Sequence, residues 1–260
     1  MFIDTHCHLD FPEFDQDRDE GIRRSKAQGI DFLVNIGSSL KSSAASLELA
    51  QKYDFVYASV GVHPHEADRF TAEDEKKLRA WAESKRVVAI GEIGLDYYLP
   101  AGQAGRNFSK PENQKPLFLA LIKMAKDLNL PLVIHTRQAE SETLQILKEM
   151  QPLSAVVHCF SGDAQFLKAC LDLGFFISFT CNITYKKAEG LRQIVKLAPL
   201  EKIFLETDAP YLSPEGLRGK RNEPLNVKYV AREIARVKGV SEEEVARATS
   251  DNAKKFFHLK

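Results

Sequence analysis

Eight short apolar runs, rich in β-branched and aromatic residues, recur along the 260-residue chain. Most are continuous in hydrophobicity instead of alternating, which is typical of strands covered on both faces in a parallel sheet. The runs span residues 2–6, 31–37, 55–61, 86–92, 130–135, 154–158, 174–179 and 202–207. This pattern predicts an α/β protein and constrains its fold more than any other feature.

The segments between the runs have helical spacing. One stripe of a helix is formed by Leu117, Phe118, Leu121, Ile122, Ala125 and Leu128. Helix starts are predicted where Thr71 precedes Asp74 and Ser241 precedes Glu244 at the capping-box spacing. Strands and helices therefore alternate along the chain.

Eight strands alternating with helices in about 250 residues have the size and rhythm of a (β/α)8 TIM-type barrel. A doubly wound open sheet is the competing arrangement. The glycine-rich phosphate loop that often accompanies the open fold is absent after the first run, where THCHLD stands instead. No linker rich in proline and glycine interrupts the alternation, so a single domain over 1–260 is expected.

Composition narrows the class of protein. Thirty-six basic residues balance thirty-six acidic ones, so any contact with nucleic acid must be local. No apolar run approaches the roughly 18 residues of a membrane helix, and the first 30 residues lack the apolar centre of a signal peptide. A cytoplasmic protein that does not enter a membrane is expected. The four cysteines lack CxxC spacing and are expected to be free thiols.

Side chains that bind metals gather at the ends of the predicted strands. The carboxyl ends of barrel strands converge on one mouth, where active sites lie. The residues at these ends are His6, His8, His63, His65, Glu92, His135, His158 and Asp208. Only His258 among the histidines lies elsewhere. Core packing explains this distribution poorly, because each buried imidazole requires a hydrogen-bond partner, whereas convergence on metal explains it as a whole.

The pair His6 and His8 shares one face of the first strand, because residues i and i+2 point the same way. Both can therefore bind one ion. Cys7 between them is expected to point away, and Cys159, next to His158, is expected to pack among helices. Alone, the H-x-H pattern is as compatible with two structural histidines as with two ligands.

Four histidines, Glu92 and Asp208 form too large a set for one tetrahedral ion. They suit two divalent ions, such as Zn, Mg or Mn, bridged by a carboxylate such as Glu92. Each assignment has a structural alternative: His135 and His158 as core histidines, Glu92 as a cap, and Asp208 as a turn residue before Pro210. Glu206, two residues before Asp208, is expected to support the site from behind.

Residues 97–112 form the one long aperiodic segment, with glycine, proline and polar residues after the fourth run. A loop beside the site is expected there, either binding the substrate or forming a passive insertion. Its aromatic residues Tyr97, Tyr98 and Phe108 either stack on bases or pack against the barrel rim.

The ordered motifs THCHLD, GVHPH, GEIGLDYY, VIHTR, HCFSG, LETDAPYL and RGKRNEP resemble those of the TatD family of metal-dependent deoxyribonucleases, within the amidohydrolase superfamily. The resemblance covers essentially the whole chain. It implies a (β/α)8 barrel with two divalent metal ions that hydrolyses DNA phosphodiester bonds. The implied metal ligands are His6, His8, Glu92, His135, His158 and Asp208. The stretch after GLDYY and the tetrapeptide PEGL depart from the family pattern, which leaves substrate preference open.

The expected mechanism is attack on phosphorus by a water that the metal ions would activate. Asp208 would help to deprotonate this water and Glu92 would hold the ions as the bridging carboxylate, so these are the expected catalytic residues. The expected substrate contacts are His63, Arg218, Lys220 and Arg221. The expected substrate is DNA or a nucleotide, and no obligate protein partner is evident. The rivals are a small-molecule amidohydrolase or esterase using the same site, and a metal-binding protein without catalysis.

Overall fold

The computed structural model of the chain describes residues 1–98 and 108–260. Eight parallel strands pair in sequence order in a single sheet. They are β1 (Phe2–Cys7), β2 (Ile30–Ile36), β3 (Val56–Val60), β4 (Val87–Asp96), β5 (Leu132–Arg137), β6 (Ala155–Val157), β7 (Phe176–Phe179) and β8 (Ile203–Leu205). Each lies within the predicted run or overlaps it, and β4 extends four residues beyond the predicted end at Glu92.

The sheet closes between β1 and the residues that follow β8. Cys7 forms a parallel bridge with Ala209, and the backbone N–H of His8 donates to the carbonyl of Ala209 at 2.7 Å. The N–H of Asp208 donates to the carbonyl of His6 at 2.9 Å. The predicted (β/α)8 barrel is therefore confirmed, and the open sheet is excluded. The same closure places His6 and His8 beside Asp208.

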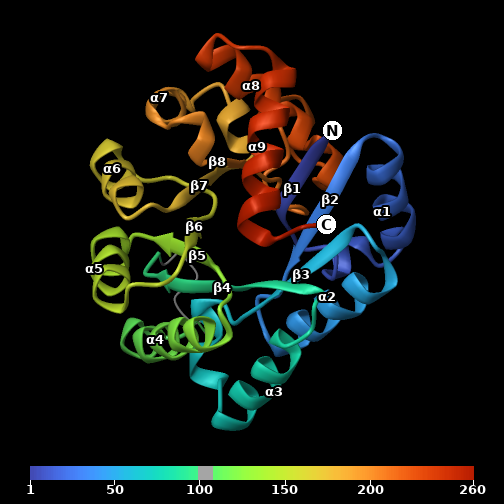
Figure 1. Cartoon of the computed structure of the whole chain (residues 1–260). Coiled ribbons are helices and arrows are strands. Elements are labelled where there is room, and N and C mark those ends of the chain that lie inside the picture. The colour runs from blue at the N-terminus through green and yellow to red at the C-terminus, as the bar shows by residue number, and fades with distance from the viewer. Residues whose placement is uncertain (99–107) are drawn as a thin grey trace.

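Helices surround the barrel (Figure 1). They are α1 (Arg18–Ala27), α2 (Leu40–Lys52), α3 (Ala72–Ala82), α4 (Pro111–Leu128), α5 (Glu140–Met150), α6 (Ala164–Asp172), α7 (Glu189–Leu197), α8 (Val227–Lys238) and α9 (Glu242–Phe257). The predicted caps are present: Thr71 and Asp74 form a capping box, and Ser241 accepts from the N–H of Glu244.

Within residues 1–98 and 108–260, no helix is both long enough and apolar enough to cross a membrane.

Helix α9 covers the end of the barrel where the strands begin (Figure 1). Its Phe256 and Phe257 share a buried cluster with Ile3, Val88 and Val133, which are the second residues of their strands. Burial of these apolar side chains stabilises this end by excluding water. The opposite end, where the strands finish, is left for polar residues and a pocket.

The loop predicted for residues 97–112 falls partly outside the described residues, which omit 99–107. On its far side, α4 begins at Pro111, a residue suited to the first helical turn. The buried amide of Gln114 joins the two flanks: it accepts from the N–H of Asp96 and donates to the carbonyls of Asp96 and Ser109.

Candidate metal centre

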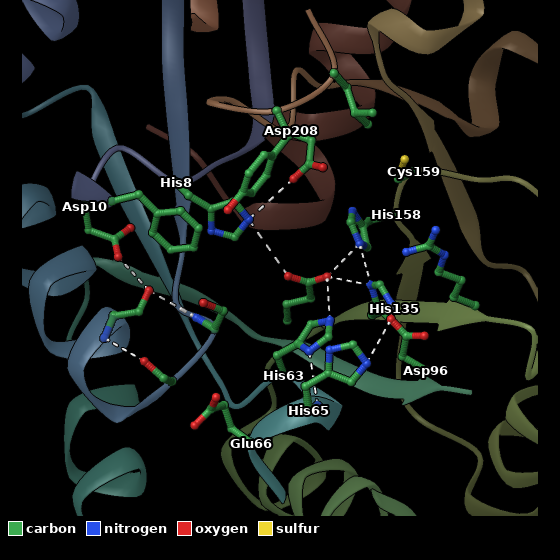
Figure 2. Close-up of a pocket in the computed structure, with 18 of the residues that line it drawn as sticks. His8, Asp10, His63, His65, Glu66, Asp96, His135, His158, Cys159 and Asp208 are labelled. Carbon is green, nitrogen blue, oxygen red and sulfur yellow. Dashed lines mark hydrogen bonds and ion pairs between the residues drawn. The ribbon is translucent and has the colours of Figure 1, made fainter. Parts of the chain in front are cut away.

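The six predicted ligands come together at the carboxyl ends of five strands. They are His6 in β1, His8 directly after β1, Glu92 in β4, His135 in β5, His158 after β6 and Asp208 after β8. All except the fully buried His6 line a pocket of about 1580 Å³. Figure 2 shows His8, His135, His158 and Asp208 pointing toward one another across it. Segments up to 202 residues apart, those of His6 and Asp208, thus meet at one site.

The histidines form two pairs whose ring nitrogens face each other. Nε2 of His6 lies 3.1 Å from Nε2 of His8, and Nδ1 of His135 lies 3.2 Å from Nε2 of His158. Two nitrogens bound about 2.05 Å from one tetrahedral metal are about 3.3 Å apart. A cation that accepts one lone pair from each of the two facing nitrogens therefore fits the spacing in both histidine pairs.

Glu92 lies between the two pairs. Its Oε1 is 2.7 Å from Nδ1 of His135 and 2.8 Å from Nε2 of His158. Its Oε2 is 3.8 Å from Nε2 of His6 and 3.9 Å from Nε2 of His8. Burial favours the neutral carboxyl, but the charge of His158 and hydrogen bonds from His135 outweigh burial and hold the pKa of Glu92 well below its usual range. Each oxygen of this ionised carboxylate thus faces one histidine pair.

Asp208 completes the side of the site formed by His6 and His8. Its Oδ1 lies 3.4 Å from Nε2 of His8 and 3.6 Å from Nε2 of His6. These three side chains form a group with the composition of a metal site. Asp208 has a left-handed backbone with φ of 55°, which is uncommon for a residue with a side chain.

Two of the nitrogens that face away from the centre lie within hydrogen-bond distance of oxygen atoms, an arrangement typical of metal-binding histidines, whereas the buried Nδ1 of His6 has no such partner. Nδ1 of His8 lies 2.9 Å from the carbonyl oxygen of Ile36, and Nε2 of His135 lies 3.1 Å from Oδ2 of Asp96. Nδ1 of His158 lies 3.5 Å from Oε1 of Glu206, in accord with the supporting position expected for that residue.

Asp96 is a residue of the site that the sequence reasoning missed. The strand alternation that relates His6 to His8 also places Glu92, Gly94 and Asp96 on one face of β4, and would have revealed it. Gly94 is required between them: its φ is 145°, and a Cβ there would lie 1.9 Å from the carbonyl oxygen of His135. The glycine lets β5 approach closely enough for His135 to reach Asp96.

His63 and His65 lie on the wall of the same pocket, at the start of a 3-10 helix (Pro64–Arg69). Nδ1 of His63 accepts from the backbone N–H of His65 at 3.2 Å, and its Nε2 lies 3.9 Å from Oε1 of Glu92. Burial and the neighbouring charge of His135 lower the pKa of His63 to about 3, so the ring is neutral at pH 7. Its single proton therefore resides on Nε2, which faces the site.

The three predicted basic contacts line a separate hollow of about 480 Å³. This hollow shares Tyr211 and Leu212 with the main pocket. The Arg221 guanidinium is paired within the protein, with its Nη2 2.7 Å from Asp17 and 3.0 Å from Glu223. The Arg218 guanidinium lies 4.6 Å from the ring centre of Tyr185.

The two cysteines near the ligands differ in position. Cys7 is fully buried and its thiol contacts the carbonyl of Val34, away from the centre as expected. The expectation for Cys159 is wrong: it lines the pocket (Figure 2), and its Sγ lies 3.6 Å from Oγ1 of Thr180 and 3.9 Å from Nδ2 of Asn182. A left-handed backbone at Cys159, with φ of 45°, accompanies this inward position.

Comparison with known proteins agrees with this arrangement. The TatD related DNase family model matches residues 3–258. The chain is 38% identical over 261 residues to the uncharacterized metal-dependent hydrolase YabD of Bacillus subtilis, with 100% of each chain covered. It is 36% identical over 265 residues to a protein of Erwinia tasmaniensis named 3'-5' ssDNA/RNA exonuclease TatD, with 99% of this chain and 100% of that protein covered.

The fold agrees as well. The crystal structure of YjjV, a TatD homologue from Escherichia coli K12, superposes with a TM-score of 0.90 at 31% identity, covering 100% of this chain and 98% of that one. The family match extends over nearly the whole chain, and it includes all six residues of the centre described above. The chain therefore belongs to the TatD family of metal-dependent hydrolases.

Proposed function

We propose that this chain is a nuclease that hydrolyses DNA phosphodiester bonds with two divalent metal ions, one at each histidine pair. The observation that carries the proposal is the position of Glu92, whose two carboxylate oxygens face different pairs. A carboxylate in that position suits a bridge between two ions 3.5–4 Å apart, a spacing typical of two-metal sites. The Erwinia relative's name, with its reference to single-stranded DNA and RNA, supports a nucleic-acid substrate.

The two proposed sets of ligands differ by one carboxylate. His6, His8 and Asp208 would hold one ion, His135 and His158 would hold the other, and Glu92 would contact both ions. Ions bound there lower the pKa of water and neutralise charge that develops on a phosphate. Asp208 is the proposed proton acceptor, because its Oδ1 faces the centre and its side chain remains partly exposed to the pocket.

His63 is proposed to contact the scissile phosphate. Its Nδ1 lone pair is used by the N–H of His65, so Nε2 carries the proton and can donate to a non-bridging phosphate oxygen or to the leaving group. The same hydrogen bond argues against a role for His63 as a metal ligand through Nε2. His65 faces Asp96 instead, with Nε2 3.3 Å from Oδ2.

Arg218 and Lys220 are proposed to contact the phosphate of a neighbouring nucleotide. They line the hollow that adjoins the main pocket at Tyr211, so a strand leaving the centre in that direction passes them. Arg221 has its guanidinium satisfied by Asp17 and Glu223, and its contribution to phosphate binding is correspondingly small. A few local cations suffice for backbone recognition by a protein of zero net charge.

The decisive experiment uses protein reconstituted with Mg²⁺, Mn²⁺ or Zn²⁺ and oligonucleotides labelled at either end, single- or double-stranded, DNA or RNA. A metal-dependent ladder of products is the expected result, and its pattern distinguishes cleavage from an end from internal cleavage. The same samples are tested on small esters, amides and lactones. Turnover of those compounds without cleavage of any oligonucleotide would contradict the proposal in favour of a small-molecule hydrolase. A cytoplasmic site of action and the absence of an obligate protein partner remain predictions.

A further inference from the structure

An aromatic wall stands beside the metal centre on the side of His8 and Asp208. Phe11 stacks on the ring of His8, with ring centres 4.6 Å apart and planes 19° apart. Tyr211 meets Phe11 edge to face, with ring centres 6.1 Å apart. Both rings line the main pocket. The wall therefore begins at a predicted metal ligand and extends outward.

Tyr211 is the outer member of this wall and is unusually exposed. The residue is 49% exposed and is one of five large apolar or aromatic residues that are exposed among the described residues. Its backbone is nevertheless fixed: the N–H of Tyr211 donates to the carbonyl of Asp208 at 2.9 Å, and its carbonyl accepts from Nδ2 of Asn222 at 2.7 Å. An aromatic ring that is open to the pocket and carried on a hydrogen-bonded backbone is the arrangement expected of a stacking platform.

The surroundings of Tyr211 indicate which ligand stacks there. The ring separates the centre that would bind one phosphate from the hollow lined by Arg218 and Lys220. A phosphate site, an aromatic ring and a cationic hollow in this order match the phosphate, base and phosphate of successive nucleotides. An apolar peptide carries no phosphate for the cations or the metal centre to bind.

We propose that Tyr211 stacks on a nucleobase next to the scissile phosphate, and that Phe11 positions Tyr211. This inference rests on the proposed nuclease function and names its substrate-binding residue. Bases in a duplex already stack on their neighbours, whereas an unpaired base is free to lie on Tyr211. The platform therefore favours single-stranded ends and does not discriminate strongly among bases, because every base has a π-face.

The test compares matched single-stranded DNA oligonucleotides with a normal base or an abasic tetrahydrofuran at the cleaved end. Stacking on one base corresponds to about a 5- to 140-fold effect. Wild-type protein is expected to cleave the base-containing oligonucleotide with a higher kcat/KM by a factor in this range. Tyr211→Ala is expected to remove that preference by slowing cleavage of the base-containing substrate only. Tyr211→Phe, which keeps an aromatic ring, is expected to retain the preference.

Tyr229→Ala provides the matched control. Tyr229 lies in α8, is 40% exposed and lines neither pocket, so its removal is expected to leave the preference unchanged. Loss of activity on both substrates by the same factor in Tyr211→Ala, or unchanged preference in that variant, would overturn the assignment. Circular dichroism of each variant confirms that it is folded.

A binding measurement separates this inference from the nuclease proposal. An oligonucleotide with terminal 2-aminopurine is titrated with protein in the Asp208→Asn background, and its fluorescence is recorded. Quenching that disappears with Tyr211→Ala supports stacking even if wild-type protein cleaves no oligonucleotide, a result that would overturn only the nuclease function. Equal quenching with and without Tyr211, or no binding, would overturn stacking.

Discussion

Asp96 Oδ2 lies 3.1 Å from Nε2 of His135, on the opposite side of the imidazole from the nitrogen that faces Glu92. This contact fixes which nitrogen of His135 is free to bind metal, because the proton is held between Nε2 and the carboxylate. Asp96 thereby acts on the centre without entering it.

Asp96→Asn is expected to weaken metal binding by about 10- to 100-fold, since an amide orients the imidazole poorly and leaves it less basic. Titration calorimetry with Mn²⁺ or Zn²⁺ measures the change. Glu66→Gln is the control, because Glu66 lines the same pocket but pairs with Arg69. Equal affinities for wild type and Asp96→Asn would contradict the positioning role.

Asp208→Asn is expected to reduce DNA hydrolysis by about 10²- to 10⁴-fold, the usual contribution of a general base. The fold should persist, because the barrel seam beside it is formed by backbone hydrogen bonds. Product release from an end-labelled oligonucleotide and a thermal melt measure the two effects. Asp251→Asn, at an exposed aspartate of α9, should behave like wild type. Full activity in Asp208→Asn would remove its assigned role.

Removal of metal by a chelator is expected to lower Tm. Without a cation the facing nitrogens of His6 and His8, 3.1 Å apart, lose the group that accepts both lone pairs. Metal at 100 times its Kd adds about 2.7 kcal/mol to the free energy of unfolding. Calorimetry with and without metal checks this, and elemental analysis with anomalous scattering should locate two ions bridged by Glu92. A single ion distant from Glu92 would contradict the two-metal site.

Replacing Arg218 and Lys220 together with glutamine is expected to weaken binding of single-stranded DNA and to flatten its salt dependence. Loss of two phosphate contacts on a single strand lowers the slope of log K against log salt by about 1.4. Fluorescence anisotropy at several salt concentrations measures the slope. If the slope is unchanged, the hollow beside Tyr211 is not on the path of the strand.

Arg221→Gln is expected to act on stability instead. Hydrogen bonding to Arg221 lowers the pKa of Asp17, so the pair stabilises the fold above the ordinary pKa of Asp17 and loses this effect as pH falls through the lowered value. At pH 7 the loss should be at most about 1 kcal/mol, because the pair is partly exposed. Urea unfolding at a series of pH values from 7 downward checks the sign: a destabilisation that grows as pH falls would contradict it.

The sequence by itself determined the barrel and where its metal-binding residues gather. Eight apolar runs separated by helical segments leave few other ways to bury a parallel sheet, and His6 and His8 share a face because a strand has a period of two. Since the parallel strands of a barrel all end at one mouth, residues such as His135 and Asp208 were expected to line the same pocket, as they do.

The tertiary structure alone decided which atoms meet. Three sets of contacts join segments 39 to 204 residues apart. Each oxygen of Glu92 faces one histidine pair, Asp96 contacts His135, and Arg221 pairs with Asp17. No local pattern specifies such contacts, because they depend on strand register and on the closure of the barrel. Local periodicity sets the face on which a side chain lies, whereas its partner is set by what the rest of the chain packs against that face.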